Sequence, residues 1–372
     1  MPRALLCVLD SLGCGAAPDA AKYGDEGANT LGHILKSVQD IKVPTLRRLG
    51  LDAIMGWTRQ SEACFGRMRP QGVGKDTTSG HWELAGAILT QPFATFERFP
   101  PELVKPIESA AKTHFLGNVV ASGTQVLENL AAQSVESGRP ILYTSVDSVL
   151  QIAAHETHFG LKRLLQICEI ARIEADKWNI GRVIARPFLE ENGVWSRTSN
   201  RRDFSMAPPR TILDALQENE IETTGIGKIS DIFAGQGISH SIPTKSNAQG
   251  MKVIEQEWNS GRDGLFFANL VDFDTLFGHR RDVLGYARAL EEFDVWLASF
   301  IPQIERDDLV IFTADHGNDP TFRGTDHTRE EVPIWVIDAG NRDNMGVRTT
   351  FADVAATIGD FFGVEWETGT SF

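Results

Sequence analysis

The feature that most restricts the fold is a series of short apolar runs separated by segments with helical spacing. Apolar runs of this length are typical of strands that are buried on both faces. Between them, Asp282–Phe300 can place an apolar stripe along one face of a helix. Strands that alternate with helices predict an α/β sandwich around a mainly parallel sheet. The runs are Ala4–Leu9, Ile141–Tyr143, Val183–Ala185, Leu265–Val271, Leu309–Thr313 and Val332–Ile337.

The composition excludes several other classes of protein. Hydrophobic residues make up 42% of the 372 residues and charged residues 23%, which rules out a mainly disordered chain, a collagen-like fibre and a coiled coil. No apolar run approaches the roughly 18 residues that a membrane helix needs. The run Ala4–Leu9 is too short for a signal peptide, and no cleavage pattern follows Asp10. We therefore expect a cytoplasmic protein with no membrane partner.

The charge balance restricts the partners further. The chain has 36 basic and 50 acidic residues, a formal net charge of −14. A nucleic-acid binder usually shows a basic excess or a dense basic stripe, so no nucleic-acid partner is expected. An anionic substrate has to be attracted by local cations against this overall charge. The four cysteines are scattered without a Cys-x-x-Cys pair, so we expect free thiols, and no obligate protein partner is evident.

Two clusters of helix-breaking residues divide the chain. Pro92, Pro100 and Pro101 form the first, and Ser205–Pro209 the second. The roughly 115 residues between them are a plausible domain size. After the second cluster the chain resumes apolar runs that end in acidic residues, as the first run does. This pattern predicts a domain inserted into another domain.

Three of the apolar runs end in carboxylates. Asp10 follows the first run, Asp272 and Asp274 follow Leu265–Val271, and Asp315 follows Leu309–Thr313 after one alanine. Ligands of open parallel sheets bind at the carboxyl ends of the strands. A single Asp after a strand is explained as a turn former or helix cap. Three such positions with histidines beside them are hard to explain in that way.

Three of the nine histidines lie close to these acidic positions in the sequence, and we interpret the other six as surface or packing residues. Six mixed oxygen and nitrogen ligands suit two divalent ions better than one. Two ions about 3.5–4 Å apart can clamp the attacking and leaving oxygens of a phosphoryl transfer. Mixed Asp and His ligation favours Mn²⁺, Zn²⁺ or Fe²⁺ over Ca²⁺. The six candidate ligands are Asp10, Asp274, His279, Asp315, His316 and His327.

The segment Gly74–Glu83 offers a protein nucleophile. It holds three adjacent hydroxyls, Thr77, Thr78 and Ser79, between glycines and beside a lysine, an aspartate and a histidine. A hydroxyl is a poor nucleophile until a metal or base lowers its pKa. The same residues are also typical of a capped helix start, and a helix N-terminus receives phosphate well. The segment alone therefore leaves open which hydroxyl acts.

A series of specific motifs extends from residue 8 to residue 330, and the last four residues, Gly369–Phe372, form a further one. They are Val8–Ser11, Ala16–Ala20, Gly74–Thr77, Gly80–Glu83, Tyr143–Ser145, Asp147–Glu156, Gly181–Phe188, Ile226–Asp231, Asp272–Asp274, Gly278–Asp282, Thr313–Pro320 and Gly324–Glu330. Together these motifs resemble the phosphopentomutases of the alkaline phosphatase superfamily. The resemblance implies a three-layer α/β/α core, residues 1–92 and 210–372, with an inserted α/β cap domain of residues 93–209.

The resemblance also implies a site and a reaction. Two Mn²⁺ ions are expected, one held by Asp10, Asp315, His316 and the Thr77 oxygen, the other by Asp274, His279 and His327. Thr77 is expected to carry a phosphoryl group, with Thr78 or Ser79 as alternative acceptors. The implied substrates are sugar phosphates: α-D-ribose 1-phosphate and D-ribose 5-phosphate, and the 2-deoxyribose pair, which interconvert through a 1,5-bisphosphate. The implied sugar-phosphate site consists of Ser145, Asp147, Arg182 and Arg197 of the cap and Lys228 of the core.

A sugar bisphosphate such as glucose 1,6-bisphosphate is expected to activate the enzyme by phosphorylating it. Two other enzymes on the same core are alternatives. A metal-dependent phosphatase would release inorganic phosphate and need no bisphosphate. The cofactor-independent phosphoglycerate mutases usually use Ser, have a longer chain and carry a different cap. A protein that only binds metal or sugar phosphate is a third alternative, but binding alone needs no nucleophile.

Overall fold

A computed structural model describes residues 2–58, 60–145, 148–337 and 344–372. The chain forms two compact units, and the second is inserted in the sequence of the first. The core unit consists of Met1–Gln91 and Pro208–Phe372, and the inserted unit of Pro92–Ala207. The structure divides the chain one residue before the first predicted boundary and two residues before the second.

The core unit is built on an eight-stranded sheet in the order β10-β9-β11-β1-β12-β13-β2-β14. From β10 to β12 neighbouring strands are parallel, whereas β13 runs antiparallel to both β12 and β2. This confirms the predicted α/β class with a mainly parallel sheet. The strands are β1 (Arg3–Leu9), β2 (Cys64–Met68), β9 (Thr223–Ile226), β10 (His240–Ile242), β11 (Gly264–Leu270), β12 (Leu309–Thr313), β13 (Val332–Ile337) and β14 (Asn344–Arg348).

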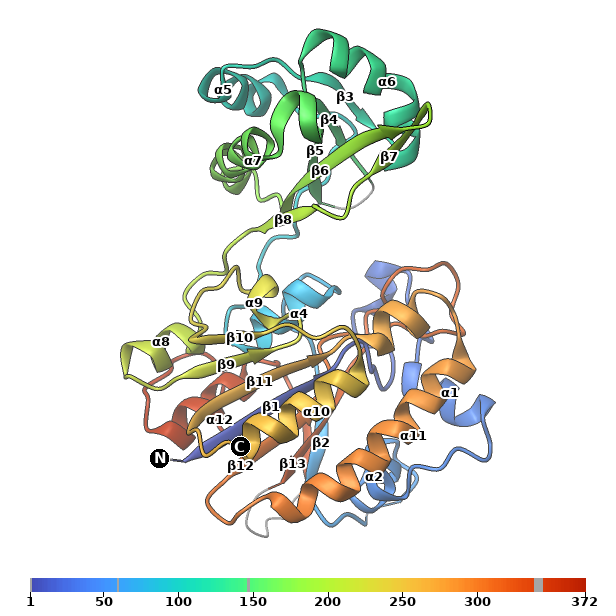
Figure 1. Cartoon of the computed structure of the whole chain (residues 1–372). Helices are drawn as coiled ribbons and strands as arrows, with labels where there is room; N and C mark the ends of the chain where they lie inside the picture. Colours follow the sequence, from blue (N-terminus) through green and yellow to red (C-terminus); the bar gives the residue numbers. More distant parts are fainter. Residues whose placement is uncertain (1, 59, 146–147, 338–343) are drawn as a thin grey trace. The chain divides into compact units, whose positions relative to one another are not determined.

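Helices cover both faces of this sheet (Figure 1). Successive strand residues point to opposite faces, as Phe266 and Phe267 of β11 show. The Phe266 ring lies 5.7 Å from Trp258 in α10, and the Phe267 ring 5.6 Å from Phe233, which directly follows α9. The helices of this unit are α1 (Thr30–Ser37), α2 (Pro44–Arg48), α3 (Leu51–Ile54), α4 (Thr77–Leu84), α8 (Ile212–Glu218), α9 (Ile229–Ile232), α10 (Asn247–Trp258), α11 (Val283–Phe300) and α12 (Asp353–Phe362), with short turns η1 (Ala20–Tyr23), η3 (Phe273–Gly278) and η4 (Ile301–Gln303).

Helix α11 shows why the sequence pattern predicts it well. The Asp282 side chain caps the helix by accepting a hydrogen bond from the Gly285 amide at 2.8 Å. Tyr286, Leu290 and Phe293 are buried along the predicted apolar stripe. The helix begins at Val283 and ends at Phe300, so the predicted segment Asp282–Phe300 is the helix with its capping residue.

The inserted unit has its own six-stranded sheet. Its strands follow the order β3-β4-β5-β6-β7, and β8 pairs with β6. β6 is longer than the predicted run Val183–Ala185. Sequence analysis did not predict β3, β7 and β8, most of whose residues are at least partly exposed, and it also missed β5, which is buried throughout. The elements are α5 (Pro101–Ala111), β3 (Leu116–Val120), α6 (Gly123–Ser137), β4 (Ile141–Thr144), β5 (Val149–His155), η2 (Glu156–Gly160), α7 (Leu161–Asp176), β6 (Arg182–Glu191), β7 (Val194–Arg197) and β8 (Arg202–Ser205).

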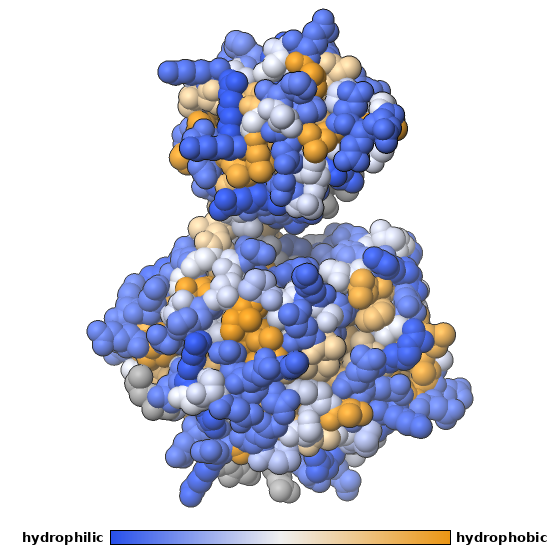
Figure 2. Space-filling view, viewed as in Figure 1, coloured by the Kyte–Doolittle hydropathy of each residue, from blue (hydrophilic) through white to orange (hydrophobic). Residues whose placement is uncertain are grey.

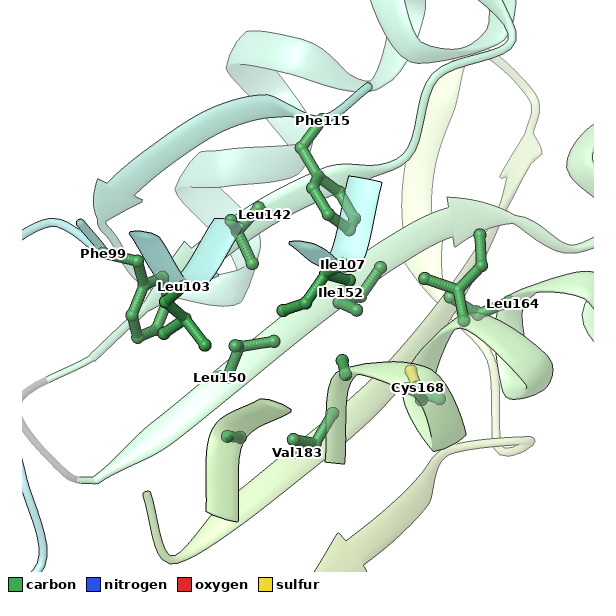
Figure 3. Packing of buried hydrophobic residues seen from close by; sticks show 14 of the residues in the cluster. Phe99, Leu103, Ile107, Phe115, Leu142, Leu150, Ile152, Leu164, Cys168 and Val183 are labelled. Atoms are coloured by element: carbon green, nitrogen blue, oxygen red, sulfur yellow. The ribbon is translucent and has the colours of Figure 1, made fainter. Parts of the chain in front are cut away.

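A hydrophobic core of its own stabilises the inserted unit. Side chains of α5 and α7 pack against β4, β5 and β6, and Figure 3 shows them pointing toward one another. Those labelled there are Phe99, Leu103, Ile107, Phe115, Leu142, Leu150, Ile152, Leu164, Cys168 and Val183. Side chains of β3–β6 and α6, including Val126 and Phe188, make a second cluster.

On the face seen in Figure 2, the surface of each unit is mainly hydrophilic, with small separate apolar areas. Within the described ranges, no helix has both the length and the apolar composition needed to cross a membrane.

Leu150 tests the independent core of the inserted unit. Its side chain is fully buried in the cluster of Figure 3. We expect Leu150→Ala to lower the free energy of unfolding of this unit by about 2–5 kcal/mol, because truncation leaves a cavity. Hydrogen exchange of the β5 and β6 amides in increasing urea measures this loss. The control Ile173→Ala, at an α7 side chain that is 64% exposed, should change it by less than about 0.5 kcal/mol; equal losses would contradict the assignment.

Candidate active site

The ends of three neighbouring strands bring the predicted carboxylates together. β1 lies between β11 and β12 and is parallel to both, so the residues that follow these strands meet at one edge of the sheet. Asp10 follows β1, Asp315 follows β12, and Asp274 lies in the turn η3 after β11. All three side chains are buried.

The first cluster consists of Asp10, Asp315 and His316. Its potential ligand atoms all lie within 4.8 Å of one another. His316 Nε2 is 3.3 Å from Asp10 Oδ1 and 3.4 Å from Asp315 Oδ2. The Thr77 hydroxyl lies beside this cluster, with Oγ1 3.5 Å from Asp10 Oδ1 and 3.2 Å from His316 Nε2. The structure thus brings together all four residues that the family resemblance assigns to one ion.

The second cluster contains Asp274, His279 and His327. His279 Nε2 is 3.2 Å from Asp274 Oδ2, and His327 Nε2 is 3.5 Å from Asp274 Oδ1. The two histidine Nε2 atoms are 3.1 Å apart. His316 also has a ligand atom within 4.8 Å of those of Asp274 and His327, so it connects the two clusters.

Burial and close charges perturb the titration of these groups. Burial raises the pKa of Asp10, and the neighbouring Asp315 carboxylate raises it further. Burial opposes protonation of His316, but the Asp315 and Asp10 carboxylates raise its pKa well above the ordinary value. Burial also acts to raise the pKa of Asp274, yet hydrogen bonds from His279 and His327 lower it. The protein therefore concentrates negative charge where water cannot screen it.

One carboxylate oxygen of the first cluster has no hydrogen-bond partner, which indicates that a cation fits this cluster. Asp315 Oδ2 is buried and accepts no hydrogen bond from the part of the chain that the structure describes. His81 Nδ1 lies 3.0 Å from it, but this nitrogen also lies 2.9 Å from the Thr77 carbonyl oxygen, to which it can only donate. A buried anionic oxygen without a donor is costly. Carboxylate and imidazole groups at these distances fit divalent transition-metal ions.

The start of helix α4 distinguishes the three hydroxyls. The Asp76 side chain accepts hydrogen bonds from the amides of Thr78 and Ser79 at 3.0 and 3.2 Å. Ser79 Oγ accepts a hydrogen bond from the Asp76 amide at 3.2 Å, which completes a capping box, and it also donates to Asp76 Oδ2 at 2.9 Å. The Ser79 hydroxyl is thus engaged in the cap, whereas the Thr77 hydroxyl contacts the first cluster.

Sequence analysis missed two residues beneath the first cluster. His81 is fully buried, and its Nε2 lies 3.2 Å from Nδ2 of Asn269, which donates to Asp10 Oδ2 at 3.1 Å. Interpreting His81 as a surface or packing residue overlooks these contacts. Two signals were available: His81 lies one helical turn after Thr77, and Asn269 is a polar residue inside the apolar run Leu265–Val271.

The predicted sugar-phosphate residues are distributed over both units. Ser145, Arg182 and Arg197 belong to the inserted unit, and Lys228 belongs to the core unit, where it precedes α9. Arg182 begins β6, with Nη1 3.9 Å from Asp203 Oδ2, and Arg197 ends β7. Asp147 lies outside the described residues.

Two further arginines, which sequence analysis did not select, lie near Arg197. Burial raises the pKa of Tyr143, whereas the charges of Arg186, Arg197 and Arg201 act to lower it. Arg201 forms a two-point ion pair with Asp203. The inserted unit therefore gathers guanidinium groups around the Tyr143 hydroxyl.

Comparison with known proteins identifies the family. The profile of the Metalloenzyme superfamily matches residues 2–366. A phosphopentomutase of Syntrophotalea carbinolica is 48% identical, with 100% of this chain and 97% of that protein covered. One from Acetivibrio thermocellus is 46% identical, with 98% and 96% covered. The chain belongs to the phosphopentomutase family.

Solved structures agree with this family at the level of the fold. A phosphoglycerate mutase of Leishmania mexicana, crystallised at low cobalt concentration, superposes with a TM-score of 0.50 at 12% identity. The alignment covers 100% of this chain and 97% of that one. At this identity the likeness shows a shared fold only. The chain therefore shares its α/β fold with that phosphoglycerate mutase, as expected for the predicted α/β class.

Asp315→Asn tests whether the first cluster is built for a cation. In metal-stripped protein, this change removes one of two buried like charges and keeps the oxygen that accepts from the Ser11 amide at 3.0 Å. Burial acts to raise the pKa of Asp315, but the neighbouring His316 and His81 lower it, so the fold stabilises this carboxylate and we expect the metal-free variant to melt no higher than the wild type. Added Mn²⁺ should raise the melting temperature less than in the wild type, because ligand binding stabilises only the protein that binds it.

The control is Asp307→Asn, at an exposed position in the loop before β12. Scanning calorimetry with and without Mn²⁺ measures both effects. An equal Mn²⁺ response in wild type and Asp315→Asn would remove Asp315 from the metal ligands.

Proposed function

We propose that this chain interconverts α-D-ribose 1-phosphate and D-ribose 5-phosphate, and the corresponding 2-deoxyribose phosphates, as an intramolecular phosphotransferase. The observation that carries this proposal is the position of the Thr77 hydroxyl, 3.2 Å from His316 Nε2 and 3.5 Å from Asp10 Oδ1. A nucleophile beside a divalent-cation site suits phosphoryl transfer, whereas binding alone needs no nucleophile. Membership of the phosphopentomutase family supports the choice of pentose phosphates.

The proposal includes two Mn²⁺ ions. One would be held by Asp10, Asp315, His316 and the Thr77 oxygen, and the other by Asp274, His279 and His327. When bound, such ions neutralise charge on the transferring phosphoryl group and lower the pKa of the attacking hydroxyl. The amides of Thr78 and Ser79 are already occupied by the Asp76 cap. Cations rather than these two amides must therefore neutralise the phosphoryl group.

Thr77 acts first as donor and then as acceptor. Phosphorylated Thr77 gives its phosphoryl group to the free hydroxyl of a bound pentose monophosphate: the Oγ1–P bond breaks, a bond from phosphorus to the sugar oxygen forms, and the proton of the sugar hydroxyl passes to Thr77 Oγ1, which becomes a hydroxyl again. The product is a 1,5-bisphosphate. Once the sugar presents its other end, Thr77 Oγ1 takes that phosphoryl group and the isomeric monophosphate leaves. The enzyme ends in its starting state, so no net phosphate is consumed.

The inserted unit supplies two of the three cations proposed to recognise the substrate, and the core unit supplies Lys228. We assign the sugar phosphate to Ser145, Arg182, Arg197 and Lys228, with Asp147 as a further predicted contact. Arginine forks match phosphate oxygens, and lysine adds a point charge. These cations have to attract a phosphate against a formal net charge of −14. We further propose that glucose 1,6-bisphosphate or a similar bisphosphate primes Thr77, and that the enzyme works in the cytoplasm.

Thr77→Val tests the nucleophile. Valine keeps the shape of threonine but deletes the oxygen beside Asp10 and His316. We expect the variant to fold, to bind metal through the six Asp and His ligands, and to lose mutase activity by several orders of magnitude. After incubation with glucose 1,6-bisphosphate, peptide mass mapping should find phosphate on Thr77 in the wild type and none in the variant.

Thr78→Val is the matched control, because it removes the neighbouring hydroxyl and keeps the amide that Asp76 accepts from. It should keep most of the activity. Phosphate on Thr78 or Ser79, or near-normal turnover by Thr77→Val, would show that another hydroxyl acts.

Arg182→Ala and Arg197→Ala test recognition of the sugar phosphate. Each should reduce kcat/KM by an amount equivalent to about 1.5–3 kcal/mol per lost charged contact. The rate at which the bisphosphate phosphorylates Thr77 should fall less. Steady-state kinetics and single-turnover labelling separate the two steps, and Arg163→Ala, at an exposed position of α7, serves as control. If the rates of both steps fall equally, these arginines support the fold or a shared phosphate pocket instead.

A further inference from the structure

Arg281, two residues after His279, connects the three segments that surround the second cluster. Its Nε donates to the Gly324 carbonyl at 2.6 Å and its Nη2 to the Asp326 carbonyl at 3.0 Å. Its Nη1 lies 2.6 Å from Asn318 Oδ1, 2.9 Å from the Asp319 carbonyl oxygen and 3.1 Å from the Gly278 carbonyl oxygen. One guanidinium thus holds the end of η3, the segment after His316 and the segment before His327.

Asn318 transmits this contact to Asp274. The Asn318 side chain is fully buried, and its Nδ2 donates to Asp274 Oδ1 at 2.7 Å. Because Asn318 Oδ1 accepts from Arg281, the amide has only one orientation that satisfies both neighbours. The guanidinium therefore fixes the amide, and the amide fixes the Asp274 carboxylate.

The segment before His327 sets the tautomer of His279. His279 Nδ1 lies 2.7 Å from the Thr325 carbonyl oxygen. A carbonyl can only accept, so Nδ1 donates to it, and Nε2, which faces Asp274 and His327, is the ring nitrogen that a metal ion would take. Arg281 holds the flanking carbonyls of Gly324 and Asp326, which places the Thr325 carbonyl.

The backbone of Arg281 is left-handed, with φ +56°. This conformation is unfavourable for a residue with a long side chain, and it persists only where the surroundings over-determine it. The carbonyl and amide oxygens around the guanidinium provide that restraint. The turn at Arg281 is thus part of the same arrangement.

Other contacts orient the first cluster. The Ser11 amide donates to Asp315 Oδ1 at 3.0 Å, and Asn269 donates to Asp10 Oδ2 at 3.1 Å. In the described part of the chain, the hydrogen bonds of Arg281 reach neither of these carboxylates. Loss of the Arg281 side chain should therefore affect one cluster selectively.

We propose that Arg281 is a positioning residue for the second metal ion. It orients Asp274 through Asn318 and His279 through the segment Gly324–Asp326, and thereby raises the affinity for that ion only. This inference rests on the two-ion assignment of the proposed function. Partners behind metal ligands typically change metal affinity by about 10- to 100-fold.

Mn²⁺ binding to the metal-stripped full chain, measured by calorimetry and electron paramagnetic resonance without substrate, tests the proposal. The wild type should bind two ions. Arg281→Asn removes the guanidinium and keeps a residue type that tolerates the left-handed turn. It should weaken one ion by about 10- to 100-fold and leave the other unchanged. The control Arg288→Asn, at an exposed position on α11, should bind both ions as the wild type does.

Two more variants separate geometry from charge and from folding. Arg281→Lys keeps the charge but lacks the fork that reaches all three segments, so it should show the same selective loss. Asn318→Leu, of similar shape, removes the donor to Asp274 Oδ1 and should also weaken one ion, which keeps the test valid if Arg281→Asn does not fold.

Each outcome decides a different question. A wild type that binds fewer than two ions would contradict the two-ion assignment in the proposed function. A wild type that binds two ions, together with unchanged affinities in Asn318→Leu or full recovery in Arg281→Lys, would overturn the role of Arg281 alone. Equal weakening of both ions in the folded Arg281→Asn variant would likewise overturn it.

Discussion

The repulsion between two buried carboxylates governs the rest of the site. Asp10 and Asp315 follow adjacent parallel strands, so the topology of the sheet brings them together before any side chain contributes. Burial and the Asp315 charge raise the pKa of Asp10, and Asp315 Oδ2 lacks a hydrogen-bond donor among the residues described. Burial also opposes ionisation of Asp315, but His316 and His81 lower its pKa, and a bound cation would stabilise both carboxylates further. His316 and the Asn269 amide contact these carboxylates directly, and the Thr77 hydroxyl lies beside them.

The two units carry opposite charge in their functional regions. The core unit concentrates Asp10, Asp274 and Asp315, whereas the inserted unit gathers Arg186, Arg197 and Arg201 near Tyr143. A carboxylate cluster suits metal ions, and guanidinium groups suit the phosphate of a substrate. This division explains how a chain with a formal net charge of −14 can use anionic sugar phosphates. In the proposed function, the core unit carries the chemistry, and the inserted unit supplies most of the substrate contacts, to which the core adds Lys228.

The sequence predicted what is local and missed what depends on distant partners. Asp10 and Asp315 could be found because each lies next to an apolar run that had to be a buried strand. β7 and β8 escaped because exposed strands lack an apolar pattern. Asn318 contacts Asp274 across 44 positions and Asn269 contacts Asp10 across 259, and no periodicity connects residues so far apart. Arg281 lies in the motif Gly278–Asp282, but nothing in the sequence shows that oxygens of three separate segments surround its guanidinium.

The most direct test of the account is conversion of ribose 1-phosphate by the purified chain with Mn²⁺, with and without glucose 1,6-bisphosphate, while free phosphate is monitored. The account predicts that ribose 5-phosphate forms, that the bisphosphate accelerates its formation, and that inorganic phosphate stays near background. A phosphoryl group that returns to Thr77 is not lost to water. Release of phosphate in step with consumption of ribose 1-phosphate, or no ribose 5-phosphate in the presence of both Mn²⁺ and bisphosphate, would contradict it.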